Sequence, residues 1–322
     1  MIRSSRSLML PATLLLSLIL TACGGGGSAT TVDNTPPAAN SPPSSNNPFE
    51  ASAPALTGDT ATDGFNRFNY RRQQMGLAAL TRNSRIDTAA VGHSNYQRVN
   101  DVITHDQIAG RPAFTGAMVP DRLNAAGYTL PASGYAYGEV ISASGDLSGS
   151  NNAEDLITAI YHRFVVFEPK FHDAGAGSVG LSASGYNFFT VEFGTTDLLG
   201  GLGTGRFAVY PFPNQTNIVT NFLNYQETPD PLPGQRGAGY PISVHADITT
   251  RVDVTTFTVQ PRGGQPLATK LLSNVTDPAE TPRSVAAIIP LSVLAPATTY
   301  DVQFVGAVSG VPVSRSWSFT TR

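Results

Sequence analysis

One carboxylate lies among aromatic and aliphatic neighbours in GYAYGEVIS, residues 134–142. The Tyr, Val and Ile content, bounded by glycine and by a Ser/Gly-rich run, predicts a β-strand over 135–142. Because alternate side chains of a strand share a face, Tyr135, Tyr137 and Glu139 should lie together. Either that face is in contact with water, or the carboxylate has a function. Burial would raise the pKa of Glu139 and suit it to act as an acid or a base.

The chain has five histidines, and each has a structural interpretation when taken alone. His105 in ITHDQ suits a surface or hydrogen-bonded position, and His162 in YHRF could bond a backbone carbonyl and lock a helix. His93 is expected on a helix packed under a sheet. His172, in a loop, is expected in solvent or lining a cleft, and His245 is assigned no role.

Other catalytic signatures are absent from the sequence. There is no Gly-x-Ser-x-Gly elbow, His-Glu-x-x-His helix, Walker loop or Cys-x-x-Cys pair. The glycines of GGLGTGR, residues 199–205, lack the strand–turn–helix context of a nucleotide loop and are interpreted as a hinge. The net charge of −3 gives no reason to expect a nucleic-acid partner.

Residues 61–198 alternate helix and strand signals, which predict helices flanking a small sheet. Helical spacing and capping residues predict helices beginning near 61, 84, 120 and 151. The strand candidates are 135–142, 177–183 and 186–193. The expected architecture is an α/β/α sandwich.

Residues 206–322 have almost no helical period and show strands at regular intervals with turn signals between them. That pattern predicts an all-β sandwich with Tyr300 and Trp317 as core aromatics. The whole chain is therefore expected to have an α+β fold, in two domains joined by the 199–205 hinge.

The N-terminus has the composition of an export signal. Residues 1–23 combine a basic start with an apolar run and end in LTAC, which resembles the bacterial lipobox. Cys23, the only cysteine, would carry the lipid. Residues 24–60 are rich in Gly, Ser, Pro and Asn and are expected to form a disordered tether. The predicted location is the cell envelope, with the outer membrane favoured if the host is Gram-negative.

Several stretches together resemble the cysteine-rich secretory, antigen 5 and pathogenesis-related (CAP) superfamily in its bacterial form. They are FNRFNYRRQQMGLAAL, RIDTAAVGHSNYQRVNDVITHDQ, DRLNAAGY, GEVIS, YHRFVVFEP, GAGSVG and YNFFTVEFG, in order across residues 61–194. The family fold is an α/β/α sandwich. Residues 206–322 resemble bacterial Ig-like modules through FAVYPFPNQTNI and the ending LAPATTYDVQFVGAVSG…WSFTT.

The resemblance implies a cleft in which two His and two Glu can bind a divalent metal such as zinc or calcium. His105, Glu139 and His162 correspond to three of those positions. No Glu aligns at the fourth, for which Glu154, Asp155 and Glu168 are weak substitutes. The expected cleft neighbours are Tyr135, Tyr137, Tyr161, Arg163 and His172.

Three functions follow from this set. The preferred one is an envelope lipoprotein, held at the membrane by its lipid, whose His/Glu cleft binds a divalent metal or a ligand without turnover. That ligand would be a small molecule, a lipid or a cell-wall component. The second is a metal-dependent hydrolase of the protease or nuclease type. The third is an adhesion or envelope-scaffold protein with structural histidines, in which an apolar groove could bind lipid or sterol.

Overall fold

The computed structural model describes residue 50 and residues 52–322. The predicted signal peptide, Cys23 and the tether up to residue 49 lie outside the described residues. Within residues 50 and 52–322, no helix has the length and apolar character needed to cross a membrane.

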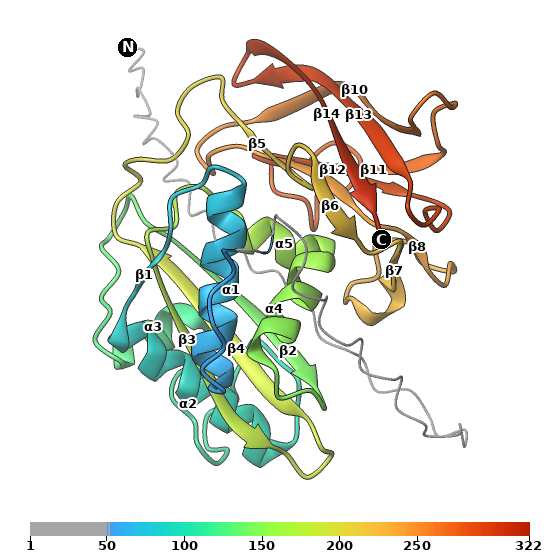
Figure 1. Cartoon of the computed structure of the whole chain (residues 1–322). Coiled ribbons are helices and arrows are strands. Elements are labelled where there is room, and N and C mark those ends of the chain that lie inside the picture. Colours follow the sequence, from blue (N-terminus) through green and yellow to red (C-terminus); the bar gives the residue numbers. More distant parts are fainter. Residues whose placement is uncertain (1–49, 51) are drawn as a thin grey trace, which may run out of the picture.

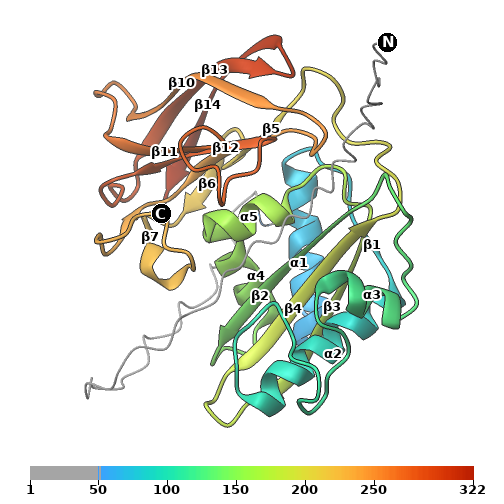
Figure 2. The same cartoon turned by 180° about the vertical axis from the view of Figure 1, so that it is seen from behind.

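The N-terminal domain is a four-stranded sheet between two layers of helices (Figures 1 and 2). Its sheet order is β1-β3-β4-β2, so β2 is an edge strand. Helices α1, α4 and α5 cover one face, and α2 and α3 cover the other. The elements are α1 (Thr60–Gln74), β1 (Thr81–Arg82), α2 (Ser84–Asn100), α3 (Val119–Ala125), β2 (Ala136–Ser144), α4 (Gly149–Thr158), α5 (Ile160–Val166), β3 (Asp173–Leu181) and β4 (Asn187–Thr195).

Strand β3 holds α2 unusually close through two glycines. A Cβ on Gly175 would lie 2.1 Å from the backbone nitrogen of Asp87, and one on Gly177 would lie 2.3 Å from that of Val91. Only glycine permits this approach. Glycine also weakens the strand signal in the sequence. The predicted strand therefore began at 177, although β3 begins at Asp173.

The single helix predicted from 151 onward is two helices. The N-cap is Ser148, whose side chain accepts a hydrogen bond from the Asn151 nitrogen, so α4 begins at Gly149. Ala159 has an extended conformation with ψ of 117° and separates α4 from α5. The break re-aims the second half of the segment toward the C-terminal region.

The C-terminal region is β-rich. It contains two four-stranded sheets, ordered β10-β13-β14-β6 and β11-β12-β9-β5, and a small β7-β8 pair. Tyr300 and Trp317 are buried, as predicted. The elements are β5 (Ala208–Tyr210), β6 (Gln215–Ile218), β7 (Asn221–Phe222), the 3-10 turn η1 (Asn224–Gln226), β8 (Ala238–Gly239), β9 (Ile242–His245), β10 (Val252–Pro261), β11 (Thr269–Ser273), β12 (Val285–Pro290), β13 (Thr299–Val308) and β14 (Val311–Thr321).

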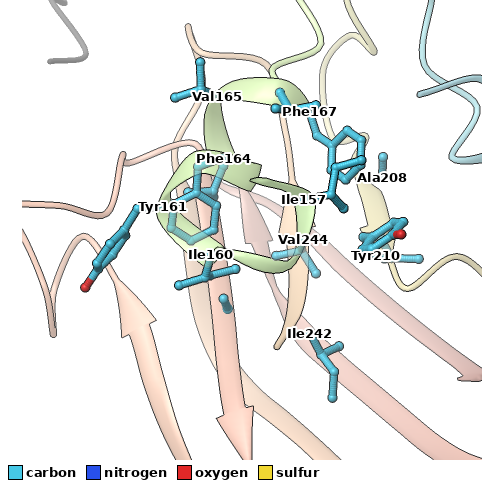
Figure 3. Close-up of a cluster of buried hydrophobic side chains, with 14 of the residues drawn as sticks. Ile157, Ile160, Tyr161, Phe164, Val165, Phe167, Ala208, Tyr210, Ile242 and Val244 are labelled. Carbon is cyan, nitrogen blue, oxygen red and sulfur yellow. The ribbon is translucent and has the colours of Figure 1, made fainter. Parts of the chain in front are cut away.

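Helix α5 joins the two parts of the chain through a shared apolar core. Figure 3 shows Ile160 and Phe164 of α5 close to Val244 of β9, with Tyr210 of β5 beside Phe167. The Phe167 and Tyr210 rings lie 5.0 Å apart. Burial of such aromatic and aliphatic side chains is the main favourable term in association. The β-rich region is therefore packed against the N-terminal domain.

The segment predicted as a hinge is bound on both sides. Lys170 of the N-terminal domain donates from Nζ to the carbonyl oxygens of Leu198 and Gly200, at 2.6 and 2.8 Å. Asp247 of the β-rich region accepts from the nitrogens of Leu202 and Gly203, at 2.7 and 2.9 Å. These contacts hold the linker to both parts of the chain.

The end of the predicted tether also contacts the folded domain. Glu50 forms ion pairs with Arg67 and Arg71 of α1, at 2.8 and 2.7 Å. Thr57 donates to Asp63 from its nitrogen and from its hydroxyl, both at 2.8 Å. The chain is therefore attached to α1 before that helix begins at Thr60.

Candidate functional site

Glu139 and His105 lie together on the sheet face that α2 and α3 cover. Nδ1 of His105 is 2.7 Å from Oε1 of Glu139. The Glu139 side chain is only 2% exposed and that of His105 5%. On the opposite face of β2, a Cβ on Gly138 would lie 2.7 Å from Val165 of α5. Glu139 therefore points away from α5.

Arg122 of α3 completes this group by linking two carboxylates. It donates to Oε2 of Glu139 at 2.6 Å and to Oε1 of Glu192 at 3.0 Å. Its third bond goes to the carbonyl oxygen of His105 at 2.9 Å. Glu192 is the register partner of Glu139 across β2 and β4. We call His105, Arg122, Glu139 and Glu192 the buried network.

Both oxygens of Glu139 are therefore engaged by side chains of the network. Burial opposes its ionisation, yet the Arg122 charge and the His105 hydrogen bond hold the pKa of Glu139 well below its usual range. Burial raises the pKa of Glu192 above its usual range, because Arg122 offsets only part of the desolvation and the Glu139 charge adds to it. Arg122 therefore lies between one carboxyl whose ionised form it favours and one whose ionisation burial opposes.

His93 and Gln107 border the network. Nε2 of His93 lies 3.9 Å from Oε1 of Glu139 and 2.7 Å from the carbonyl oxygen of Thr104. Gln107 contacts Nδ1 of His93 at 2.9 Å. Burial lowers the pKa of His93 to about 4, so this imidazole is neutral at pH 7. His93 is packed under the sheet, as the sequence predicted.

His162 does not join His105 and Glu139. It lies on α5, on the other side of the sheet, and its Nδ1 is 3.2 Å from Oε1 of Glu227 in the β-rich region. The Glu227 carboxylate also accepts from the nitrogens of Ile160 and Tyr161, at 2.9 and 2.6 Å. These are the N–H groups that the break at Ala159 leaves without helical partners. An acidic partner of His162 therefore comes from the second part of the chain.

The expected cleft neighbours lie on opposite faces of the N-terminal sheet. Tyr135 and Tyr137 share the Glu139 face and stack at 6.4 Å. Tyr161 donates to Asp277 at 3.0 Å, and Arg163 donates to the Pro241 carbonyl oxygen at 2.7 Å, so both face the β-rich region.

His172 is separate from these groups. Its side chain is 40% exposed, and Nδ1 lies 3.7 Å from Oδ1 of Asp197. It therefore sits at the surface near the start of the linker.

The substitutes considered for the fourth family position lie elsewhere. Glu154 pairs with Arg67 and Arg71 of α1. Glu168 accepts from the nitrogens of Lys170 and Ile248, both at 3.0 Å. Asp155 lies beside Glu154 on α4, and burial raises its pKa to about 6. None of the three is hydrogen-bonded to the buried network.

The donor set of the network does not suit zinc or calcium. Arg122 already supplies the positive charge that a metal would bring, and it occupies one oxygen of Glu139. Within residues 50 and 52–322, no group of three or more His, Cys, Asp or Glu side chains is arranged to hold a metal ion. The atoms of the network without a partner in this part of the chain are Nε2 of His105 and Oε2 of Glu192. Two such atoms fall short of the three or more ligands that these ions take.

The sequence profile of the cysteine-rich secretory protein family, CAP, matches residues 65–193. The chain therefore carries a CAP domain, followed by a β-rich region. No curated protein matches the chain.

Several solved structures are similar to parts of the chain. An extracellular protein containing an SCP domain from Bacillus anthracis is 22% identical, with 42% of this chain and 39% of that chain covered and a TM-score of 0.34. This chain thus spans about two fifths of that one. An outer surface protein from Borrelia burgdorferi is 14% identical, with 41% of this chain and 88% of that chain covered and a TM-score of 0.34. The copper resistance protein PcoC from Escherichia coli is 18% identical, with 35% of this chain and 95% of that chain covered and a TM-score of 0.22.

Proposed function

We propose that the chain is a non-catalytic adhesion or scaffold protein of the bacterial cell envelope, attached to the membrane through lipid on Cys23. The observation that carries the proposal is the state of Glu139. Its side chain is 2% exposed, and both of its oxygens are engaged by His105 and Arg122. A general base must reach a substrate proton directly or through one water, and this carboxylate has no such access.

The packing of the β-rich region supports a scaffold role. Arg163 of α5 lies 5.0 Å from the ring centre of Tyr210 and 4.9 Å from that of Tyr240. Glu227 and Asp277 add hydrogen bonds to α5 from the same side. These contacts hold the β-rich region against the CAP domain, which suits a protein that presents a surface.

The test compares the purified full chain with a His105→Asn variant. Asn retains a short donor toward Glu139 and removes the imidazole. We expect neither purified protein to turn over peptides or nucleic acids with zinc or calcium present. Expressed in cells, both should be found in the envelope fraction. A Cys23→Ala variant should leave that fraction. Turnover by the native chain that His105→Asn abolishes, with circular dichroism unchanged, would show that the chain is an enzyme.

A further inference from the structure

The outer sheet of the β-rich region carries a polar hollow. Strands β10, β13 and β14 lie on the side away from the CAP domain, since β5 and β9 of the other sheet contact α5 (Figures 1 and 3). A hollow of about 550 Å³ opens on these outer strands. Its size falls within the range of small-molecule sites.

Strand register places the lining residues in two rows across three strands. Thr258, Gln303 and Ser316 are paired across β10, β13 and β14. Gln260, Asp301 and Ser318 form the next row in the same way. Positions two apart on a strand share a face. The rows therefore present hydroxyl and amide groups side by side.

Most of this polar capacity is unused within the protein. No side-chain hydrogen bond in the described part of the chain engages Thr258, Gln260, Gln303 or Ser316. Each Gln can donate two hydrogen bonds and accept two more, and each hydroxyl can do both. A ligand that itself carries many donors and acceptors is the best match to such a surface.

The hollow is nearly neutral. Its cation, Arg262, is paired with Asp301 at 2.8 Å. A nucleic acid needs unpaired cations along its phosphates. A protein partner favours exposed aromatic or aliphatic anchors, whereas Trp317 in this lining is 6% exposed and donates its Nε1 to the Pro211 carbonyl oxygen at 3.0 Å.

We propose that this hollow binds an uncharged oligosaccharide, with Gln260, Gln303 and Ser316 hydrogen-bonding its hydroxyl groups. The inference rests on the proposed adhesion or scaffold role and names its ligand class. No residue of the buried network lines the hollow.

The experiment measures binding of chitotetraose, cellotetraose and maltotetraose to the full chain by calorimetry. Ser316→Trp fills the hollow. Ser314→Trp is the matched control, because Ser314 is exposed on the same strand and face but outside the hollow. We expect at least one tetrasaccharide to bind, Ser316→Trp to weaken it about tenfold or more, and Ser314→Trp to leave it unchanged. Gln303→Ala should weaken it in the same direction.

Two results would overturn the proposal: no binding of any of the three tetrasaccharides at millimolar concentration, or equal effects of the two Trp variants on binding. If binding fails while the chain stays in the envelope fraction and lacks turnover, the hollow is excluded and the envelope role stands. If the chain instead shows His105-dependent turnover, the proposed function itself fails.

Discussion

Replacing Arg122 by Met tests the buried network most severely. The Arg122 side chain is fully buried and donates three hydrogen bonds, to Glu139, Glu192 and the His105 carbonyl oxygen. Methionine fills similar space and removes the charge. The variant therefore leaves two buried carboxyl groups without their cation.

The magnitude follows from burial. Removing one partner of a buried ion pair costs about 3–5 kcal/mol, mostly because the other charge is left unpaired. If Glu139 is that charge, the further change Glu139→Gln should restore about 1–3 kcal/mol. Without Arg122 the folded-state pKa of both carboxyls rises. The folded variant then holds protons that the unfolded chain loses above about pH 4.3, so its stability falls as pH rises through that window.

The assay is urea unfolding followed by far-ultraviolet circular dichroism, at pH 5 and pH 7. The matched control is Arg251→Met. Arg251 pairs with Asp253 at 2.7 Å, but the two side chains are 59% and 46% exposed. That change should cost less than about 1 kcal/mol. A loss below about 1 kcal/mol for Arg122→Met, or no recovery in the double variant, would show that Arg122 does not stabilise the two buried carboxyl groups.

Three other changes give sharp outcomes. Burial raises the pKa of Glu168 to about 8, so the folded state resists ionisation of this carboxyl group. As pH rises from about 5 to 8, the melting temperature of the native chain should therefore fall relative to that of Glu168→Gln. Parallel curves of melting temperature against pH would contradict this. Glu227→Ala removes the acceptor for Ile160 and Tyr161 and should cost about 2 kcal/mol or more in urea unfolding, whereas His162→Ala should cost less because both backbone bonds remain. Gly177→Ala should lower stability by about 1–3 kcal/mol in the same assay, and a neutral result would show that α2 can move off β3.

Strand and helix periods predicted the layers of the CAP domain, and strand alternation predicted that Tyr135 and Tyr137 lie together, as their stacked rings do. The family resemblance added His105, whose contact with Glu139 no local period can indicate. Arg122 and Glu192 were missed. Arg122 lies in a seven-residue helix that also contains Asp121, so the sequence pattern predicts a solvent-exposed Arg122 side chain.

A usable signal for Glu192 existed. It lies in YNFFTVEFG on the same face of β4 as Thr190, within a strand that is buried throughout. A carboxylate in such a strand needs a buried partner.

The position of His162 could not be predicted from its own segment. Its partner Glu227 is 65 residues away and lies in another part of the chain. The helix breaks at Ala159, which turns α5 toward Glu227. No Pro or Gly lies at this break, so the sequence contains no residue that would predict it.

The most direct test of the central claim is a zinc titration of the full chain and of Glu139→Gln by calorimetry. If Glu139 is a structural carboxylate held by Arg122 and His105, the two titrations should coincide. One equivalent of zinc taken up by the native chain and lost in Glu139→Gln, with circular dichroism unchanged, would instead establish a metal site at this carboxylate.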